Sequence, residues 1–221
     1  ATRTVTLYVV ALALFFISCE DFISGPLLDQ NPNKGDDVAA VSAEALLVGS
    51  QVTIYGIMEG YLNRAVSMVM QQMSGLQTDY YRDYNCEPID VNTNGRWTAI
   101  YGTGGLIDMK TTQKVANDQE KFVLLAISQM WEALIISTAA DLWGDIPYSE
   151  AISGFENINP TFDSRTGVIY PRVMSLLDEA ASGFNASSGG KDFGSDVVIY
   201  GGNVSAWKKA VNAIKARAYL Q

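Results

Sequence analysis

The chain has 221 residues, of which 48% are hydrophobic and 18% charged, the balance of a folded domain rather than of a disordered segment. Its 15 basic and 24 acidic residues give a net charge of −9, which disfavours binding to nucleic acid or to an anionic lipid surface. It contains no histidine, which excludes Ser-His-Asp and Cys-His triads and imidazole metal ligands.

The N-terminus has the pattern of a lipoprotein signal. The apolar run at residues 7–17 is shorter than the roughly 20 residues that span a bilayer, and it has the length of a signal-peptide core. It leads into Phe-Ile-Ser-Cys at residues 16–19, which resembles a lipobox. We therefore expect residues 1–18 to be a signal peptide and residues 19–37 to be an acylated N-terminus and tether, with the lipid on Cys19. The alternative is an ordinary buried N-terminal helix.

Cys86 is the second of only two cysteines. A disulfide between Cys19 and Cys86 is the simplest interpretation of such a pair in an exported protein. Because acylation explains Cys19 better, we expect Cys86 to be an unpaired thiol. Neither cysteine belongs to a CxxC motif, so we expect no metal site and no other cofactor.

Helical periodicity dominates the rest of the chain. We expect helices at about 42–57, 61–73, 96–116, 119–141, 170–184 and 205–221. Ser42 and Ser205 are the expected N-caps of the first and last of these helices. The expected third helix is kinked at Gly102–Gly105, and Pro171 either lies in the first turn of a helix that begins near Tyr170 or kinks it.

Residues 122–140 contain a single charged side chain, Glu132, so they should form the central buried helix. The run is not expected to span a membrane, because it is interrupted by polar residues: Ser128, Gln129, Glu132, Ser137 and Thr138. The methionines of the second helix, Met68, Met70 and Met73, are expected to fill the core. Alternation with a period of two is nearly absent, and only 196–200 suggests a short strand. The fold class is therefore all-α, with antiparallel helix pairs that stack in a tetratricopeptide-like way.

An aromatic, amide-rich loop is expected at residues 75–95. Aromatic faces stack on sugar rings, while amides and carboxylates bind hydroxyl groups, so the loop is a candidate ligand site. The candidate residues are Tyr80, Tyr81, Arg82, Asp83, Tyr84, Asn92, Asn94 and Trp97. The alternative is that these aromatic side chains only pack the loop onto the helices.

Asp141 and Asp145 flank a turn and invite comparison with a glycosidase pair. The favoured interpretation is a helix end, at which Gly144 takes the left-handed conformation, Pro147 stops the helix and the carboxylates accept backbone N–H groups. On this interpretation neither aspartate is catalytic.

Several strings resemble one known family. Residues 141–151, Asp-Leu-Trp-Gly-Asp-Ile-Pro-Tyr-Ser-Glu-Ala, resemble the hallmark of SusD/RagB-type outer-membrane lipoproteins, especially their SusD-like second subfamily. The structural motif within it consists of Asp141, Trp143, Gly144, Asp145, Pro147 and Tyr148. Stretches at 160–170, 177–180 and 198–218 fit the family in the same order. The glycines at 102–105, Pro171 and Val211 depart from its pattern.

The resemblance implies an all-α, tetratricopeptide-like fold, anchored at the outer membrane and facing outward. It implies a protein that is not an enzyme, that captures oligosaccharides (in some branches peptides or other nutrients), and that hands them to a SusC-like TonB-dependent transporter. Family chains are longer, and the chain begins with Ala1 and stops at Gln221 within a helical pattern. We therefore expect residues 38–221 to be the N-terminal part of the helical domain, truncated at the C-terminus. The resemblance assigns no ligand-binding residue.

Overall fold

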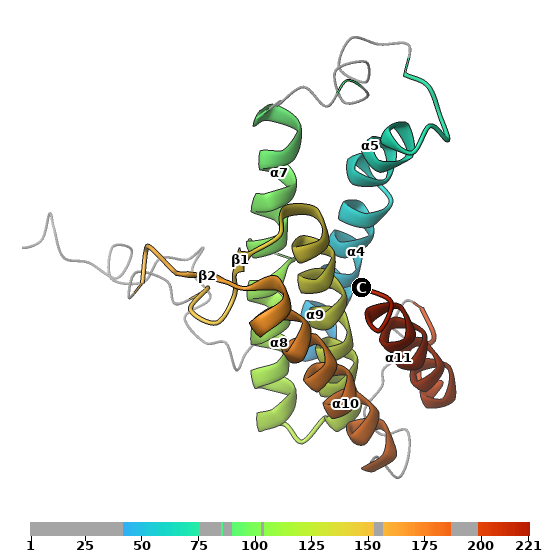
Figure 1. Cartoon of the computed structure of the whole chain (residues 1–221). Coiled ribbons are helices and arrows are strands. Elements are labelled where there is room, and N and C mark those ends of the chain that lie inside the picture. Colours follow the sequence, from blue (N-terminus) through green and yellow to red (C-terminus); the bar gives the residue numbers. More distant parts are fainter. Residues whose placement is uncertain (1–41, 76–84, 86–89, 103, 153–156, 187–198) are drawn as a thin grey trace, which may run out of the picture. The chain divides into compact units, whose positions relative to one another are not determined.

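The computed structural model describes residues 42–75, 85, 90–102, 104–152, 157–186 and 199–221. The chain divides into two units, Ala1–Ala40 and Val41–Gln221, and all described residues belong to the second (Figure 1). The predicted signal peptide, the tether, Cys19, Cys86 and most of the predicted strand at 196–200 lie outside the described residues. Within the described part, Ile199 and Tyr200 belong to a turn.

The first two described helices are α4 (Ala43–Met58) and α5 (Tyr61–Val69). Ser42 caps α4 as predicted, because its hydroxyl accepts a hydrogen bond from the Ala45 amide at 3.4 Å. Helix α5 ends earlier than the predicted Met73, close to Gln71, whose φ of 58° is left-handed. As a result Met68 is buried, whereas Met70 and Met73 are 64% and 48% exposed. The prediction that all three methionines fill the core was therefore wrong for two of them.

Two helices replace the single kinked helix predicted at 96–116. They are α7 (Asp90–Tyr101) and α8 (Leu106–Asp118), and α7 extends into the region predicted as loop. Gly104, with φ of 80°, lies in the break between them. At Gly105 an added Cβ would come within 2.3 Å of the Ala99 and Ile100 carbonyl oxygens. Only glycine therefore allows the chain to turn so closely past the end of α7.

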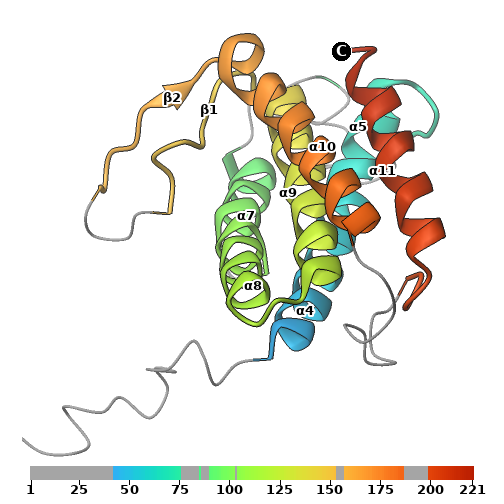
Figure 2. The same ribbon diagram turned by 90° about the horizontal axis from the view of Figure 1, so that it is seen from below.

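The central helix is α9 (Phe122–Trp143), as predicted. Its length and composition would allow it to cross a membrane, since an 18-residue window of the helix has a mean hydropathy of 1.6. However, 72% of that window is buried inside the fold. It packs against α8, α10 and α4 (Figures 1 and 2). Burial on nearly every side explains why its sequence lacks a polar face.

A two-stranded ladder follows α9, formed by β1 (Ile146–Pro147) and β2 (Phe162–Asp163). The strands are antiparallel, with Ile146 opposite Asp163. One π-helical segment, η3 (Arg165–Ile169), then leads into α10 (Tyr170–Ala186), so Pro171 occupies the first turn, one of the two predicted alternatives.

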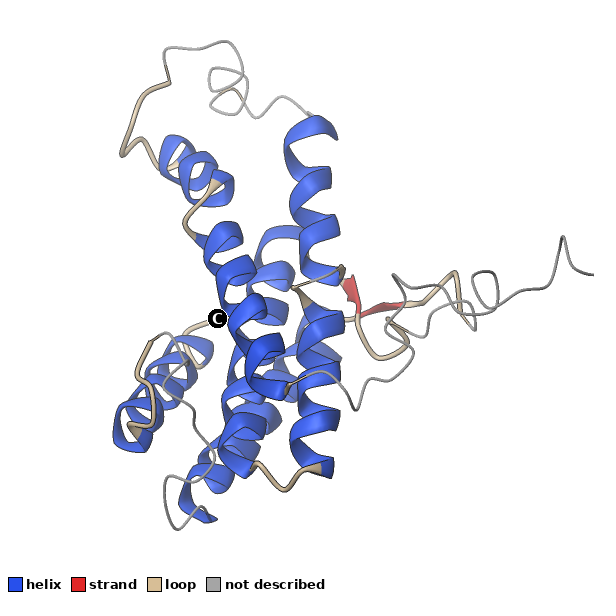
Figure 3. Ribbon diagram, turned by 180° about the vertical axis from the view of Figure 1, so that it is seen from behind, coloured by secondary structure: helices blue, strands red, loops and turns tan. Residues whose placement is uncertain are grey.

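The last helix is α11 (Val204–Ala218). Asn203 rather than Ser205 caps it, since the Asn203 carbonyl oxygen Oδ1 accepts from the Ala206 amide at 3.1 Å. The predicted neighbours are confirmed: α8 packs on α9, and α10 packs on α11. Helices account for nearly all regular structure in the described residues, which confirms the all-α class (Figure 3).

Candidate functional site

A carboxylate lies at the centre of the fold. Glu132, on α9, is fully buried, with 0% of its side chain exposed. Its Oε1 accepts the phenolic proton of Tyr148 at 2.6 Å, and its Oε2 accepts from Gln113 Nε2 at 2.5 Å. Lys110 forms an ion pair with the same carboxylate. A buried charge is tolerated when its partners replace water in this way.

The chain after α9 positions Tyr148. Helix α9 ends at Gly144, whose φ of 81° redirects the backbone into β1. The amides of Tyr148 and Ser149 then both donate to Asp163 Oδ2, at 3.0 and 2.6 Å. The carboxylate of β2 thus fixes the backbone from which the phenol reaches Glu132.

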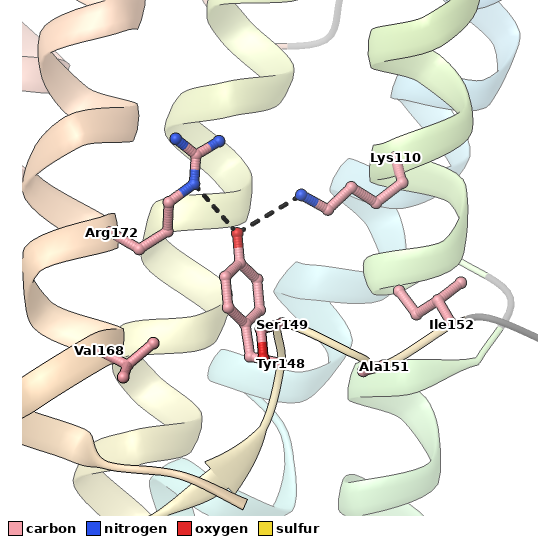
Figure 4. A pocket seen from close by; sticks show the side chains of 7 residues that line it. All are labelled: Lys110, Tyr148, Ser149, Ala151, Ile152, Val168 and Arg172. Atoms are coloured by element: carbon pink, nitrogen blue, oxygen red, sulfur yellow. Dashed lines mark hydrogen bonds between the residues drawn. The ribbon is translucent and has the colours of Figure 1, made fainter. Parts of the chain in front are cut away.

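Two cations approach the Tyr148 hydroxyl from opposite sides (Figure 4). Lys110 Nζ and Arg172 Nε each lie 3.4 Å from the phenolic oxygen. Arg172 also pairs with Glu179 at 2.6 Å. Burial, followed by the neighbouring Glu132 carboxylate, raises the pKa of the Tyr148 phenol above its ordinary value. The hydroxyl therefore keeps its proton for Glu132 and accepts from the two cations.

An open pocket of about 450 Å³ lies over this cluster (Figure 4). It is lined by Lys110, Tyr148, Ser149, Ala151, Ile152, Val168 and Arg172. Lys110 and Arg172 supply positive charge, whereas the apolar walls consist of Ala151, Ile152 and Val168. Ile152 has φ of 69°, a conformation that β-branched residues rarely adopt. A pocket of this size and mixed character is typical of a site for a small ligand.

The two aspartates of the motif bind residues of η3 and of the start of α10. Asp141 Oδ1 accepts from Arg165 at 2.8 Å and from the Tyr170 hydroxyl at 2.6 Å. Asp145 Oδ1 accepts the backbone amide of Arg165 at 2.8 Å, as predicted for a carboxylate in a turn. Asp141 differs from the prediction because its partners are side chains, including Arg217 at 3.8 Å. A second hollow, of about 300 Å³, adjoins Asp141 and Arg217.

The predicted aromatic ligand site is only partly described. Tyr80, Tyr81, Arg82, Asp83 and Tyr84 lie outside the described residues. Asn92 and Asn94 belong to α7, so the prediction that they lie in a loop was wrong. The half-buried indole of Trp97 packs on Tyr101 and on Trp143, with ring centroids 4.9 and 5.3 Å apart. Trp97 therefore contributes to packing between α7 and α9.

Sequence reasoning identified Tyr148 as part of a motif but missed Lys110 and Arg172. The one signal was Glu132, the single charge in an otherwise apolar helix. A buried carboxylate requires a cation or proton donors nearby, but the sequence does not reveal which lysine or arginine of the chain supplies them.

The fold is similar to that of proteins with solved structures. Nine chains of solved structures match the fold. One is a SusD/RagB family protein from Bacteroides thetaiotaomicron, with a TM-score of 0.68 and 19% sequence identity. The match covers 80% of this chain and 38% of that chain, so this chain spans less than half of the neighbour's length. No curated protein matches significantly.

A family model agrees with the fold. It covers residues 36–221, which include every helix described above, both strands and the motif at residues 141–151. Its description is "starch-binding associating with outer membrane". The chain therefore belongs to the SusD-like family, in the second subfamily that the motif at residues 141–151 resembles.

Proposed function

We propose that the protein is a cell-surface binding protein that captures oligosaccharides and delivers them to a SusC-like TonB-dependent transporter in the outer membrane. The family match over residues 36–221, with its description of starch binding at the outer membrane, carries the proposal. The pocket beside Tyr148 supports it, because apolar walls and polar side chains together suit a sugar ring and its hydroxyl groups.

The proposed role is binding without catalysis. The carboxylates of Asp141 and Asp145 are engaged by Arg165, which supports a structural role over that of a glycosidase pair. We expect no new reducing ends when the protein is incubated with oligosaccharides that it binds. A steady release of reducing ends that disappears in an Asp141→Asn variant would establish the glycosidase alternative.

The proposed membrane attachment is a lipid on Cys19, with the body facing outward. Incorporation of radiolabelled palmitate into the full-length protein, and its loss in a Cys19→Ser variant, tests the anchor. Cleavage by a protease added to intact cells tests the orientation. If Cys19 carries the lipid, Cys86 has no disulfide partner within residues 1–221, so a thiol reagent should label it when this part of the protein is denatured without reduction.

The aromatic segment remains a proposed ligand contact. Its residues Tyr80 to Tyr84 combine three aromatic rings with one basic and one acidic side chain. Stacking of a sugar on such a ring is worth on the order of 1 kcal/mol, so replacing all three tyrosines by alanine should weaken glycan binding at least tenfold.

The decisive experiment is a glycan array probed with the full-length protein, with a peptide library as the parallel arm. We expect selective retention on glycans and none on peptides. Binding to peptides alone would instead establish peptide capture on the same scaffold. Co-purification with a barrel transporter from detergent-solubilised outer membranes then tests the delivery partner.

A further inference from the structure

The pocket beside Tyr148 differs in charge from the chain as a whole. The chain carries a net charge of −9, yet the described residues lining the pocket include two cations and no acid. The carboxylates that pair with these cations, Glu132 and Glu179, are not part of the lining. Among the described residues, the charged side chains that line the pocket are therefore both cations.

Both cations retain hydrogen-bonding capacity. Lys110 has three N–H donors, of which the described contacts use two, on Glu132 and on Tyr148. Arg172 donates through Nε to Tyr148 and through Nη1 to Glu179 and Ser175, and within the described part of the chain no contact engages its Nη2. The side chains of Lys110 and Arg172 are 40% and 34% exposed, so a ligand can reach them.

The remaining walls suit the carbon skeleton of a small ligand. Ala151, Ile152 and Val168 form the apolar side of the pocket, and its volume of about 450 Å³ accommodates one or two sugar rings. The left-handed backbone of Ile152 is a strained conformation, and such strain gathers at binding sites where the surroundings hold it in place.

We propose that this pocket binds a carboxylate-bearing ligand and, on the proposed function on which this inference rests, the uronic-acid unit of an acidic oligosaccharide. The Nη2 group of Arg172, which the described contacts leave unengaged, can donate a charge-assisted hydrogen bond to a carboxylate. Lys110 adds a second charge-assisted donor on the opposite side of Tyr148. A neutral sugar would leave both cations without a counterpart on the ligand, so affinity should depend on the ligand's charge.

Calorimetry on the full-length protein tests the proposal with a matched pair of probes. Trigalacturonate carries free carboxylates, whereas its methyl ester has the same rings without charge, and maltotriose is the neutral reference. We expect the wild-type protein to bind the acid at least tenfold more tightly than the ester. The Arg172→Gln variant should lose most of that preference. Lys110 is left intact because its loss would leave the buried Glu132 without a cation.

Two further variants separate pocket effects from general charge effects. Val168→Phe should fill the pocket and weaken trigalacturonate binding at least tenfold without touching the polar network. Lys114→Gln removes an exposed charge from the same helix, one turn from Lys110, and should leave affinity within twofold of wild type. Circular dichroism confirms that each variant is folded.

The outcomes distinguish this inference from the proposed function. Equal affinity for acid and ester, binding of maltotriose alone, or undiminished binding by Arg172→Gln and Val168→Phe would each overturn the carboxylate pocket and leave oligosaccharide capture standing. Failure of every glycan, acidic or neutral, would overturn the proposed function and this inference together. Binding of free galacturonate as tightly as the trimer would retain the carboxylate site but assign it to small acids rather than oligosaccharides.

Discussion

Removing the hydroxyl of Tyr148 should destabilise the fold by about 2 kcal/mol. The hydroxyl donates at 2.6 Å to Glu132, whose side chain is 0% exposed, and hydrogen bonds to charged groups contribute about 1.5–3 kcal/mol. The carboxylate keeps Lys110 and Gln113, which limits the loss. Lys110 and Arg172 are partly exposed, so water replaces the phenolic oxygen at little cost. The expected effect is a large part of the 5–15 kcal/mol that stabilises typical domains.

Urea unfolding of Tyr148→Phe, followed by far-ultraviolet circular dichroism, measures the effect. Tyr200→Phe is the matched control, because this ring is 45% exposed and should change stability by no more than about 0.5 kcal/mol. A double-mutant cycle with Glu132→Gln should give a coupling of about 1 kcal/mol or more, since the two groups are in direct contact. A Tyr148→Phe variant as stable as its control, or an additive cycle, would refute the role assigned to the buried carboxylate.

Three other changes follow from single contacts. Gly105→Ala should cost about 3 kcal/mol, because the new Cβ meets backbone oxygens at 2.3 Å, and an unchanged urea midpoint would contradict this. Asp141→Asn weakens the hydrogen bonds to Arg165 and Tyr170, so thermal unfolding should reveal a loss of about 1.5 kcal/mol in the free energy of unfolding. An unchanged melting temperature would contradict a stabilising role for these contacts. Tyr148 stays protonated in the fold while an unfolded tyrosine loses its proton near pH 10.0. The stabilisation that the protonated phenol provides is therefore complete below pH 10 and declines as the pH rises above 10. The free energy of unfolding should consequently fall more steeply above pH 10 for wild type than for Tyr148→Phe.

Strong local signals predicted the fold. The apolar run at residues 122–140 predicted the central helix α9, because the run has no polar face that could lie against solvent. Ser42 predicted the start of α4, and Gly144 the end of α9, since each supplies a specific capping geometry. These features depend on residues close together in sequence.

Errors arose where the local signal was weak. Helix α7 begins at Asp90, although residues 90–95 are mostly poor helix formers and resemble a loop. Asn203 and Ser205 are both good N-caps, and only the structure reveals that Asn203 takes this position. Strands of two residues, such as β1 and β2, are too short for alternation to appear.

The candidate site could not be predicted because it assembles residues distant in sequence. Lys110, on α8, and Arg172, on α10, meet at Tyr148 only after both helices pack on α9. Either residue alone resembles an ordinary surface charge. Sequence reasoning reached the motif residue Tyr148, and the packing of three helices supplied its partners.

Calorimetric titration of the full-length protein with the glycan that it retains on the array tests the central claim most directly. We expect saturable heat with a defined stoichiometry, no heat with a peptide of similar size, and no release of reducing ends during the titration. Absence of saturable binding to any glycan, or heat from peptides alone, would contradict the assignment of this SusD-like chain to oligosaccharide capture.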